Sequence, residues 1–311
     1  MKYYLYALIL ILSAAGATLV VPLFASISQN SLTFLQIPQN YLPQVAGIEN
    51  VNLTPVNLGQ KVPELEARSI LVKDIATDTI LYQKDVNFPV PIASTTKIMT
   101  ALIGSDYFKP NSILTVEDSP EVLGSKVGLV RGEVLSFRSA LYAMLLNSGN
   151  DAAFAIAENY PGGVLGFISQ MNKKAQSLNL RNTHFDNPAG FDSPNHFASA
   201  ADLAVITQEA LKDPDLLRVF ATKDTVITSL DQKYSHNLQN LNKLLWNVPG
   251  VLGVKTGFTD AAKENLVTLV ERDGHQVLTI VLGSDDRFGE STKLINWVFQ
   301  NFTWSSQSMN H

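Results

Sequence analysis

The chain has 311 residues, which is enough for one large domain or two smaller ones. Hydrophobic residues make up 46% of it and charged residues only 16%, so a sizeable core is expected, while the net charge of −5 gives no basic surface for nucleic acid. The chain contains no cysteine, which excludes disulfides, thiolate metal sites and a cysteine nucleophile.

The N-terminus has the pattern of an export signal. Residues 3–25 follow Lys2, carry no charge and are mostly apolar. The small residues Ala15-Gly16-Ala17 fit a cleavage site, whereas the apolar run continues to Phe24 and is long enough to cross a bilayer. We therefore expect residues 1–25 to be either a signal peptide or an N-terminal membrane anchor, and the rest of the protein to be extracytoplasmic.

The next segment, residues 26–62, is rich in Gln, Asn, Pro and Ser, and its charged residues are Glu49 and Lys61. No helical or strand period persists in it, so a flexible linker is predicted. The main domain is then expected at residues 63–303, followed by a short tail at residues 304–311.

Periodicity predicts the elements of this domain. Strands are expected at 69–74 and 79–83, and strand signals return at 251–256, 265–271 and 276–282. Asp273-Gly274 marks a hairpin turn between the last two, and Ser136 is a candidate helix N-cap. Helices are expected at 94–104, 136–146, 151–159, 164–178, 199–212, 214–220 and 288–302. Strands at both ends with helices between them indicate an α+β fold, in which an antiparallel sheet carries an inserted helical subdomain.

Three short motifs carry the chemistry. They are Ser94-Thr95-Thr96-Lys97, Ser148-Gly149-Asn150 and Lys255-Thr256-Gly257, in this order. Residues i and i+3 share one face of a helix, so the hydroxyl and the amine of the first motif are expected side by side. An isolated motif of this kind is more simply a helix cap followed by a solvated lysine. The order and wide separation of the three motifs favour a serine acyl-transfer site that needs no histidine.

The motifs and their flanks resemble the active-site-serine D,D-peptidases, and above all the low-molecular-weight D-alanyl-D-alanine carboxypeptidases of peptidase family S11, which are penicillin-binding proteins. The resemblance covers about residues 64–303. It rests on the motifs together with residues 91–102, 145–153, 182–188 and 253–262. It implies a β-lactamase/transpeptidase-like fold, an antiparallel five-stranded sheet flanked by helices.

The resemblance also implies a function. The expected reaction removes the terminal D-alanine from peptidoglycan stem pentapeptides through a Ser94 acyl-enzyme, during bacterial cell-wall remodelling. The protein would be anchored to the cell membrane through its N-terminal segment or secreted to the cell wall. Stem peptides are the expected partners, β-lactam antibiotics are expected covalent inhibitors, and no cofactor and no nucleic acid are expected.

Four residues are expected to be catalytic. Ser94 is the nucleophile, and Lys97 can be its base only if burial and a second cation, Lys255, lower its pKa from about 10.4 by about 3 units. Ser148 is expected to relay a proton to the leaving amine. Asn150 is expected to hold Lys97 and the substrate amide.

Substrate binding is expected from the third motif and its neighbours. Lys255 and Thr256 would bind the terminal carboxylate of the substrate, and Gly257 would let the backbone approach closely. By the resemblance, the backbone N–H groups of Ser94 and Phe258 form the oxyanion hole. Arg287 is either a further carboxylate ligand or a solvated residue at a helix N-terminus.

Other interpretations stay open. A D,D-endopeptidase would use the same residues, and a non-catalytic peptidoglycan-binding scaffold would not need them. A class A-like β-lactamase needs a further Glu for deacylation, and the segment 185–196 contains Asp186 and Asp192 but no Glu. No metal site is expected, because the five histidines show no metal-ligand spacing. Lys263 adds a cation near the third motif.

Overall fold

The structure is a computed structural model that describes residues 53–118 and 121–305. The expected signal or anchor at residues 1–25 and most of the expected linker lie outside the described residues. Within the described part of the chain, no helix is long and apolar enough to cross a membrane.

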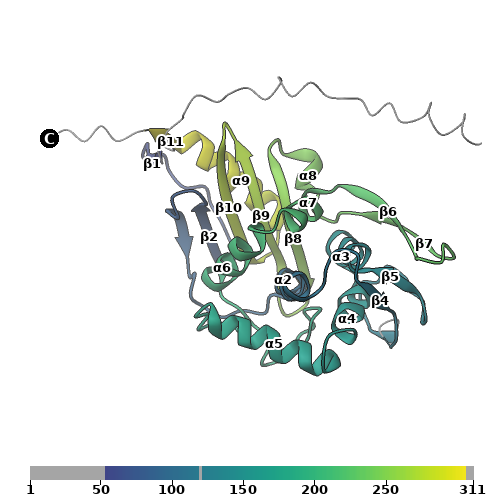
Figure 1. Cartoon of the computed structure of the whole chain (residues 1–311). Coiled ribbons are helices and arrows are strands. Elements are labelled where there is room, and N and C mark those ends of the chain that lie inside the picture. The colour runs from purple at the N-terminus through teal and green to yellow at the C-terminus, as the bar shows by residue number, and fades with distance from the viewer. Residues whose placement is uncertain (1–52, 119–120, 306–311) are drawn as a thin grey trace, which may run out of the picture. The chain divides into compact units, whose positions relative to one another are not determined.

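A five-stranded antiparallel sheet lies at the centre of the fold (Figure 1), and its strand order is β3-β2-β10-β9-β8. Its strands are β2 (Ser69–Asp74), β3 (Ile80–Lys84), β8 (Val251–Thr259), β9 (Lys263–Arg272) and β10 (His275–Ser284). The β9–β10 turn has positive φ at both Asp273 and Gly274, as the hairpin prediction required. The expected fold is confirmed, and β8, which carries the third motif, forms one edge of the sheet.

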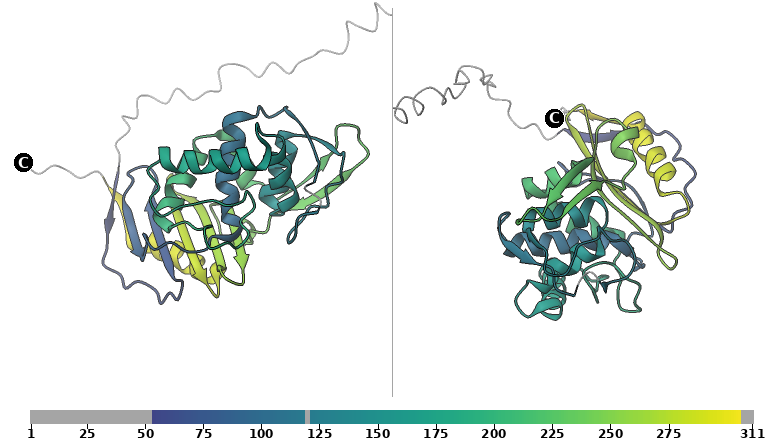
Figure 2. Two further views of the ribbon diagram at one scale, coloured as in Figure 1. Left: turned by 90° about the horizontal axis from the view of Figure 1, so that it is seen from below. Right: turned by 90° about the vertical axis from the view of Figure 1, so that its right-hand side faces the viewer.

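Helices cover both faces of the sheet, because consecutive apolar residues along a strand point to opposite faces and make both of them apolar. In β2, the side chains of Ile70 and Val72 pack into the core beneath α8 (Leu244–Asn247) and α9 (Arg287–Asn301). Leu71, between them, packs into the core shared with α2 (Lys97–Tyr107) and α6 (Ala200–Leu211). The two layers are visible on opposite sides of the sheet in Figure 2.

The helical subdomain lies between β3 and β8 in the chain. Besides α2 and α6, this subdomain contains α3 (Phe137–Leu146), α4 (Asn150–Glu158), α5 (Gly163–Ser177) and α7 (Pro214–Ala221). Ser136 caps α3 by accepting a hydrogen bond from the Ser139 N–H at 3.1 Å, as expected. Two antiparallel strand pairs that the sequence did not indicate also belong to this part of the chain. They are β4 (Ile113–Thr115) with β5 (Val134–Ser136), and β6 (Asp224–Thr228) with β7 (Ser235–Gln239).

The expected domain boundaries need correction at both ends. Strand β1 (Thr54–Asn57), inside the expected linker, pairs with β11 (Phe302–Ser305), which runs into the expected tail. The buried Asn301 side chain extends this contact by accepting a hydrogen bond from the Gln60 N–H at 2.7 Å. Local pattern could not reveal this pairing, because each short strand is stabilised by a partner at the other end of the chain.

Candidate active site

Ser94 lies in a tight turn that leads into a helix. The 3₁₀ turn η2 (Ala93–Thr96) continues directly into α2, so Ser94 and Lys97 face the same side as predicted. The Lys97 Nζ atom donates a hydrogen bond to the Ser94 Oγ atom at 3.0 Å. Ala93, just before the serine, has φ of +48°, a conformation that is uncommon for a residue with a side chain.

Two glycines let backbone segments pack directly against this turn. A β-carbon placed at Gly190, where φ is +94°, would lie 1.9 Å from the Ala93 carbonyl oxygen. One placed at Gly257 of β8 would lie 3.2 Å from the Ser94 backbone nitrogen. The turn that carries Ser94 is therefore held between the loop at residues 185–196 and strand β8.

Lys97 is fully buried and has three hydrogen-bond acceptors. Besides Ser94, its Nζ atom donates to Asn150 Oδ1 at 2.7 Å and to the Ala189 carbonyl oxygen at 2.6 Å. Burial lowers the pKa of Lys97 well below its usual value, and the positive charge of Lys255 lowers it further. The neutral amine that a general base requires is thus favoured in this environment. In that form its two N–H bonds serve Asn150 and Ala189, and its lone pair faces the Ser94 hydroxyl, which then donates.

The second motif forms the connection between α3 and α4. Ser148 is buried with φ of +58°, and Asn150 begins α4. The Asn150 side chain donates from Nδ2 to the Leu123 carbonyl oxygen at 2.8 Å, which fixes its Oδ1 atom toward Lys97. Asp151 accepts hydrogen bonds from the backbone N–H groups of residues 127–129 and so holds the neighbouring loop in place.

The loop at residues 185–196 supplies the carbonyl group that contacts Lys97. Asn187 Oδ1 accepts hydrogen bonds from the N–H groups of residues 189–191, at 2.7 to 3.1 Å, and so shapes the loop tip. The sequence did not predict this contact, because the group that accepts the hydrogen bond from Lys97 is the Ala189 backbone carbonyl. The sequence feature that could have indicated a tight loop here is Asn187-Pro188 followed by Gly190.

His196 stabilises the same loop. Its Nδ1 atom accepts a hydrogen bond from the Asp186 N–H at 3.0 Å, so the ring proton lies on Nε2, which donates to Thr96 Oγ1 at 2.7 Å. Burial lowers the pKa of His196 to about 4. The neutral ring thus joins the loop to the turn that carries Ser94.

Strand β8 places the third motif beside Ser94. Lys255 is buried, and its Nζ atom donates to the Thr256 carbonyl oxygen at 3.0 Å. Burial, and then the positive charge of Arg287, lower the pKa of Lys255 to about 7. Thr256 is also buried, whereas the Phe258 side chain is 57% exposed.

Arg287 lies at the start of α9 and contacts the backbone of β8. Its side-chain Nη1 atom donates to the Gly257 carbonyl oxygen at 2.7 Å, and its backbone N–H donates to Glu264 Oε2 at 3.0 Å. The guanidinium is half-buried, so Arg287 is not a solvated helix residue. Lys263, the added cation, lies 3.7 Å from Asp285 and forms an exposed ion pair with it.

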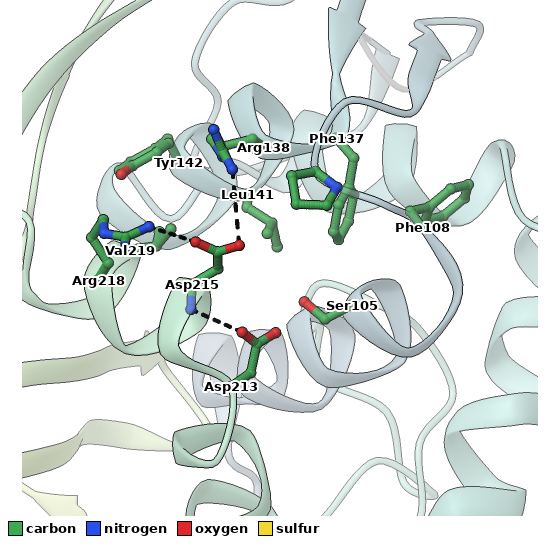
Figure 3. Close-up of a pocket in the computed structure, with 11 residues that line it drawn as sticks. Ser105, Phe108, Phe137, Arg138, Leu141, Tyr142, Asp213, Asp215, Arg218 and Val219 are labelled. Carbon is green, nitrogen blue, oxygen red and sulfur yellow. Dashed lines mark hydrogen bonds and ion pairs between the residues drawn. The ribbon is translucent and has the colours of Figure 1, made fainter. Parts of the chain in front are cut away.

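The three motifs thus converge on one place. Within residues 53–118 and 121–305, no three His, Asp or Glu side chains are grouped to hold a metal ion. The pocket in Figure 3 lies elsewhere, against α2, α3 and α7, and contains none of the motif residues. Among its charged residues, Asp215 pairs with Arg218 at 2.5 Å and lies 3.8 Å from Arg138.

Known proteins share this sequence and this fold. The model of the peptidase S11 family, described as D-alanyl-D-alanine carboxypeptidase, matches residues 57–286. The chain belongs to this family. It is 33% identical over 256 residues to the D-alanyl-D-alanine carboxypeptidase DacF of Bacillus subtilis, an alignment that covers 78% of this chain but only 65% of that relative.

Two further relatives carry other activities in their names. A D-alanyl-D-alanine endopeptidase of Pseudomonas aeruginosa is 32% identical over 245 residues, which are 76% of this chain and 78% of that protein. The crystal structure of the Streptomyces K15 DD-transpeptidase superposes with a TM-score of 0.74 at 30% identity, covering 78% of this chain and all of that one. The family inferred from the three motifs is confirmed.

Proposed function

We propose that this protein is a serine-type D-alanyl-D-alanine carboxypeptidase that removes the terminal D-alanine from peptidoglycan stem pentapeptides outside the cytoplasm. The observation that carries the proposal is the contact between Ser94 Oγ and a buried Lys97 whose pKa is strongly lowered. A serine hydroxyl is a weak nucleophile until a neighbouring base removes its proton. The buried amine of Lys97 is that base.

The reaction then proceeds through an acyl-enzyme. As Lys97 Nζ takes the proton, Ser94 Oγ attacks the carbonyl carbon of the penultimate D-alanine, and the backbone N–H groups of Ser94 and Phe258 stabilise the oxyanion. The C–N bond breaks, and the leaving D-alanine receives the proton through Ser148. Water hydrolyses the ester with Lys97 again as base, and Asn150 keeps the lysine in position.

The terminal carboxylate of the substrate binds at β8. A protonated Lys255 attracts the carboxylate, and the hydroxyl of Thr256 donates a hydrogen bond to it. Arg287 acts indirectly, since its contact with the Gly257 carbonyl supports the strand and its charge lowers the pKa of Lys255. The same anionic group in β-lactam antibiotics makes them covalent inhibitors of this site.

An endopeptidase would differ from a carboxypeptidase in the amine that leaves when Ser94 is acylated. A transpeptidase would differ in the acceptor of the acyl group, an amine in place of water. The similarity to a named endopeptidase and to a named transpeptidase supports testing both. A β-lactamase is disfavoured, because the loop at residues 185–196 has no Glu to drive deacylation. A binding scaffold is disfavoured, because it needs no buried lysine beside a serine.

Product analysis tests the proposal. The protein is incubated with a stem pentapeptide, with a cross-linked dimer of stem peptides, and with the pentapeptide plus an amine acceptor. Free D-alanine from the pentapeptide, lost in Ser94→Ala, is expected to be the main product. Cleavage of the dimer alone would assign an endopeptidase, and transfer to the amine in preference to water would assign a transpeptidase. No product in any reaction would contradict the proposal.

A further inference from the structure

Asp192 places a carboxylate beside β8, beyond the third motif. The Thr259 Oγ1 atom donates a hydrogen bond to Asp192 Oδ1 at 2.8 Å. Residues two apart in a strand share a face, so Thr259 lies on the face where Gly257 approaches Ser94. The carboxylate therefore lies beside Thr259 on the Ser94 side of β8, and Thr259 itself is about 7 Å along the strand from Gly257.

An extended substrate would pass this carboxylate. Strand β8 pairs with β9 along one edge, and within residues 53–118 and 121–305 its other edge has no partner strand in the central sheet. If the Phe258 N–H binds the scissile carbonyl, a peptide added antiparallel to β8 has its terminal carboxylate near Thr256 and its preceding residues near Thr259. The residue before D-alanyl-D-alanine then lies opposite Thr259, with the two β-carbons about 5 Å apart.

We propose that Asp192 binds an ammonium group at the end of the side chain that precedes D-alanyl-D-alanine. This inference rests on the proposed function. The third residue of a stem peptide is a diamino acid, L-lysine or meso-diaminopimelate, so the side chain opposite Thr259 ends in a primary ammonium. A four-carbon stem such as that of lysine spans the remaining distance to the carboxylate.

The surrounding charges are consistent with a cation at this position. The ammonium of Lys263, which lies across from Thr259 in the hairpin, pairs with Asp285 on the β10 side. Asp186, the other acid of the loop, accepts a hydrogen bond from Ser193 and lies 3.4 Å from His184. The bond from Thr259 orients Asp192, and the loop behind it is fixed by Asn187 and His196.

Three matched peptides test this site. They are Nα-acetyl-L-Lys-D-Ala-D-Ala, its Nε-acetylated form, which lacks the charge, and the meso-diaminopimelate counterpart of the first. We measure kcat/KM for D-alanine release by the wild type, Asp192→Asn and Asp273→Asn. The control removes the same charge from the exposed turn at the far end of β9. Asparagine can still accept the bond from Thr259, so the loop is expected to keep its shape.

The wild type and the control are expected to prefer at least one ammonium peptide over the acetylated one by about two- to tenfold at low salt. The better of the two ammonium peptides identifies the diamino acid. The Asp192→Asn variant is expected to bring the ratio close to one. Equal rates for all three peptides in the wild type, or an unchanged ratio in Asp192→Asn, would overturn the inference while leaving the carboxypeptidase intact. Hydrolysis of none of the peptides would overturn both.

Discussion

The side-chain nitrogen of Lys97 lies between the Ser94 hydroxyl, at 3.0 Å, and the Ala189 carbonyl oxygen, at 2.6 Å. One contact comes from the turn before its own helix, and the other from a loop about 90 residues further along the chain. The Lys97 amine is thus oriented by groups from two parts of the fold. Its position depends on the loop as much as on the motif that contains it.

Replacing Lys97 by Met is expected to slow acylation of Ser94 by about 10²- to 10⁴-fold, the usual contribution of a general base. Methionine has a similar length but cannot take a proton. The measurement is the second-order rate of acylation by benzylpenicillin. Lys173→Met, on the exposed side of α5, makes the same exchange away from the site and should acylate at the wild-type rate. Near-normal acylation of Lys97→Met would assign the base elsewhere.

The charge of Lys255 predicts how activity depends on pH. Its pKa is lowered to about 7 by burial and by Arg287, so the free enzyme loses this cation as the pH rises through neutrality. We expect kcat/KM for peptides with a free carboxylate to fall over that range. Arg287→Met removes one cause of the lowering and should move this alkaline limb to higher pH. Arg287→Lys keeps the charge and should leave the alkaline limb of the pH profile near its original position. Identical alkaline limbs in the wild type and both variants would disprove the effect of Arg287 on the pKa of Lys255.

The neutral state of His196 predicts an acid-dependent loss of stability. Its pKa is lowered to about 4 in the folded protein and is about 6.5 in an unfolded chain, so the unfolded state binds more protons between these values. The free energy of unfolding therefore falls as the pH drops from about 6.5 toward 4, by about 3 kcal/mol at most. The contribution is fully present above that range.

Chemical denaturation of the wild type and His196→Gln at pH 7 and pH 4.5 isolates this effect from the titration of the carboxylates. The wild type should lose more stability than the variant over this interval. Parallel losses in the two proteins would mean that His196 is not kept neutral by the fold.

Gly190 is expected to tolerate no side chain. A β-carbon there would meet the Ala93 carbonyl oxygen at 1.9 Å, in addition to the strain of a φ of +94°. Gly132→Ala is a matched control, because its φ is +83° and no atom of the part of the chain that the structure describes lies within 4 Å of the added carbon. The control should lose about 1–2 kcal/mol from backbone strain alone. Gly190→Ala should lose clearly more and should also acylate more slowly, whereas equal losses would show that the close approach is unimportant.

The sequence predicted the regular parts of the fold well, because their signals are local. The apolar run Ile70-Leu71-Val72 predicts a strand, and Asp273-Gly274 predicts a hairpin turn, each from neighbouring residues alone. The strand pairs β1–β11, β4–β5 and β6–β7 depend on partner strands rather than on strong local patterns. The same distinction applies to the site.

The side chains of the three motifs could be identified from the sequence, since each motif contains its own reactive groups. The structure brings Ser94 and Asn150 into contact with Lys97, with Gly257 against the turn and Lys255 close enough to lower the pKa of Lys97. The Ala189 carbonyl and the contact between Arg287 and the Gly257 carbonyl involve backbone atoms. Every residue has such backbone groups, so the sequence cannot show which of them contact the site, and the fold is needed to identify them.

Ser94 is expected to be the nucleophile, and intact-mass spectrometry with benzylpenicillin shows whether this residue is acylated. The wild type should gain the mass of one penicillin and keep it, while Ser94→Ala should gain none. Rapid hydrolysis of penicillin without a lasting adduct would indicate a β-lactamase instead. An adduct that persists in Ser94→Ala, or no adduct and no hydrolysis in the wild type, would contradict the account.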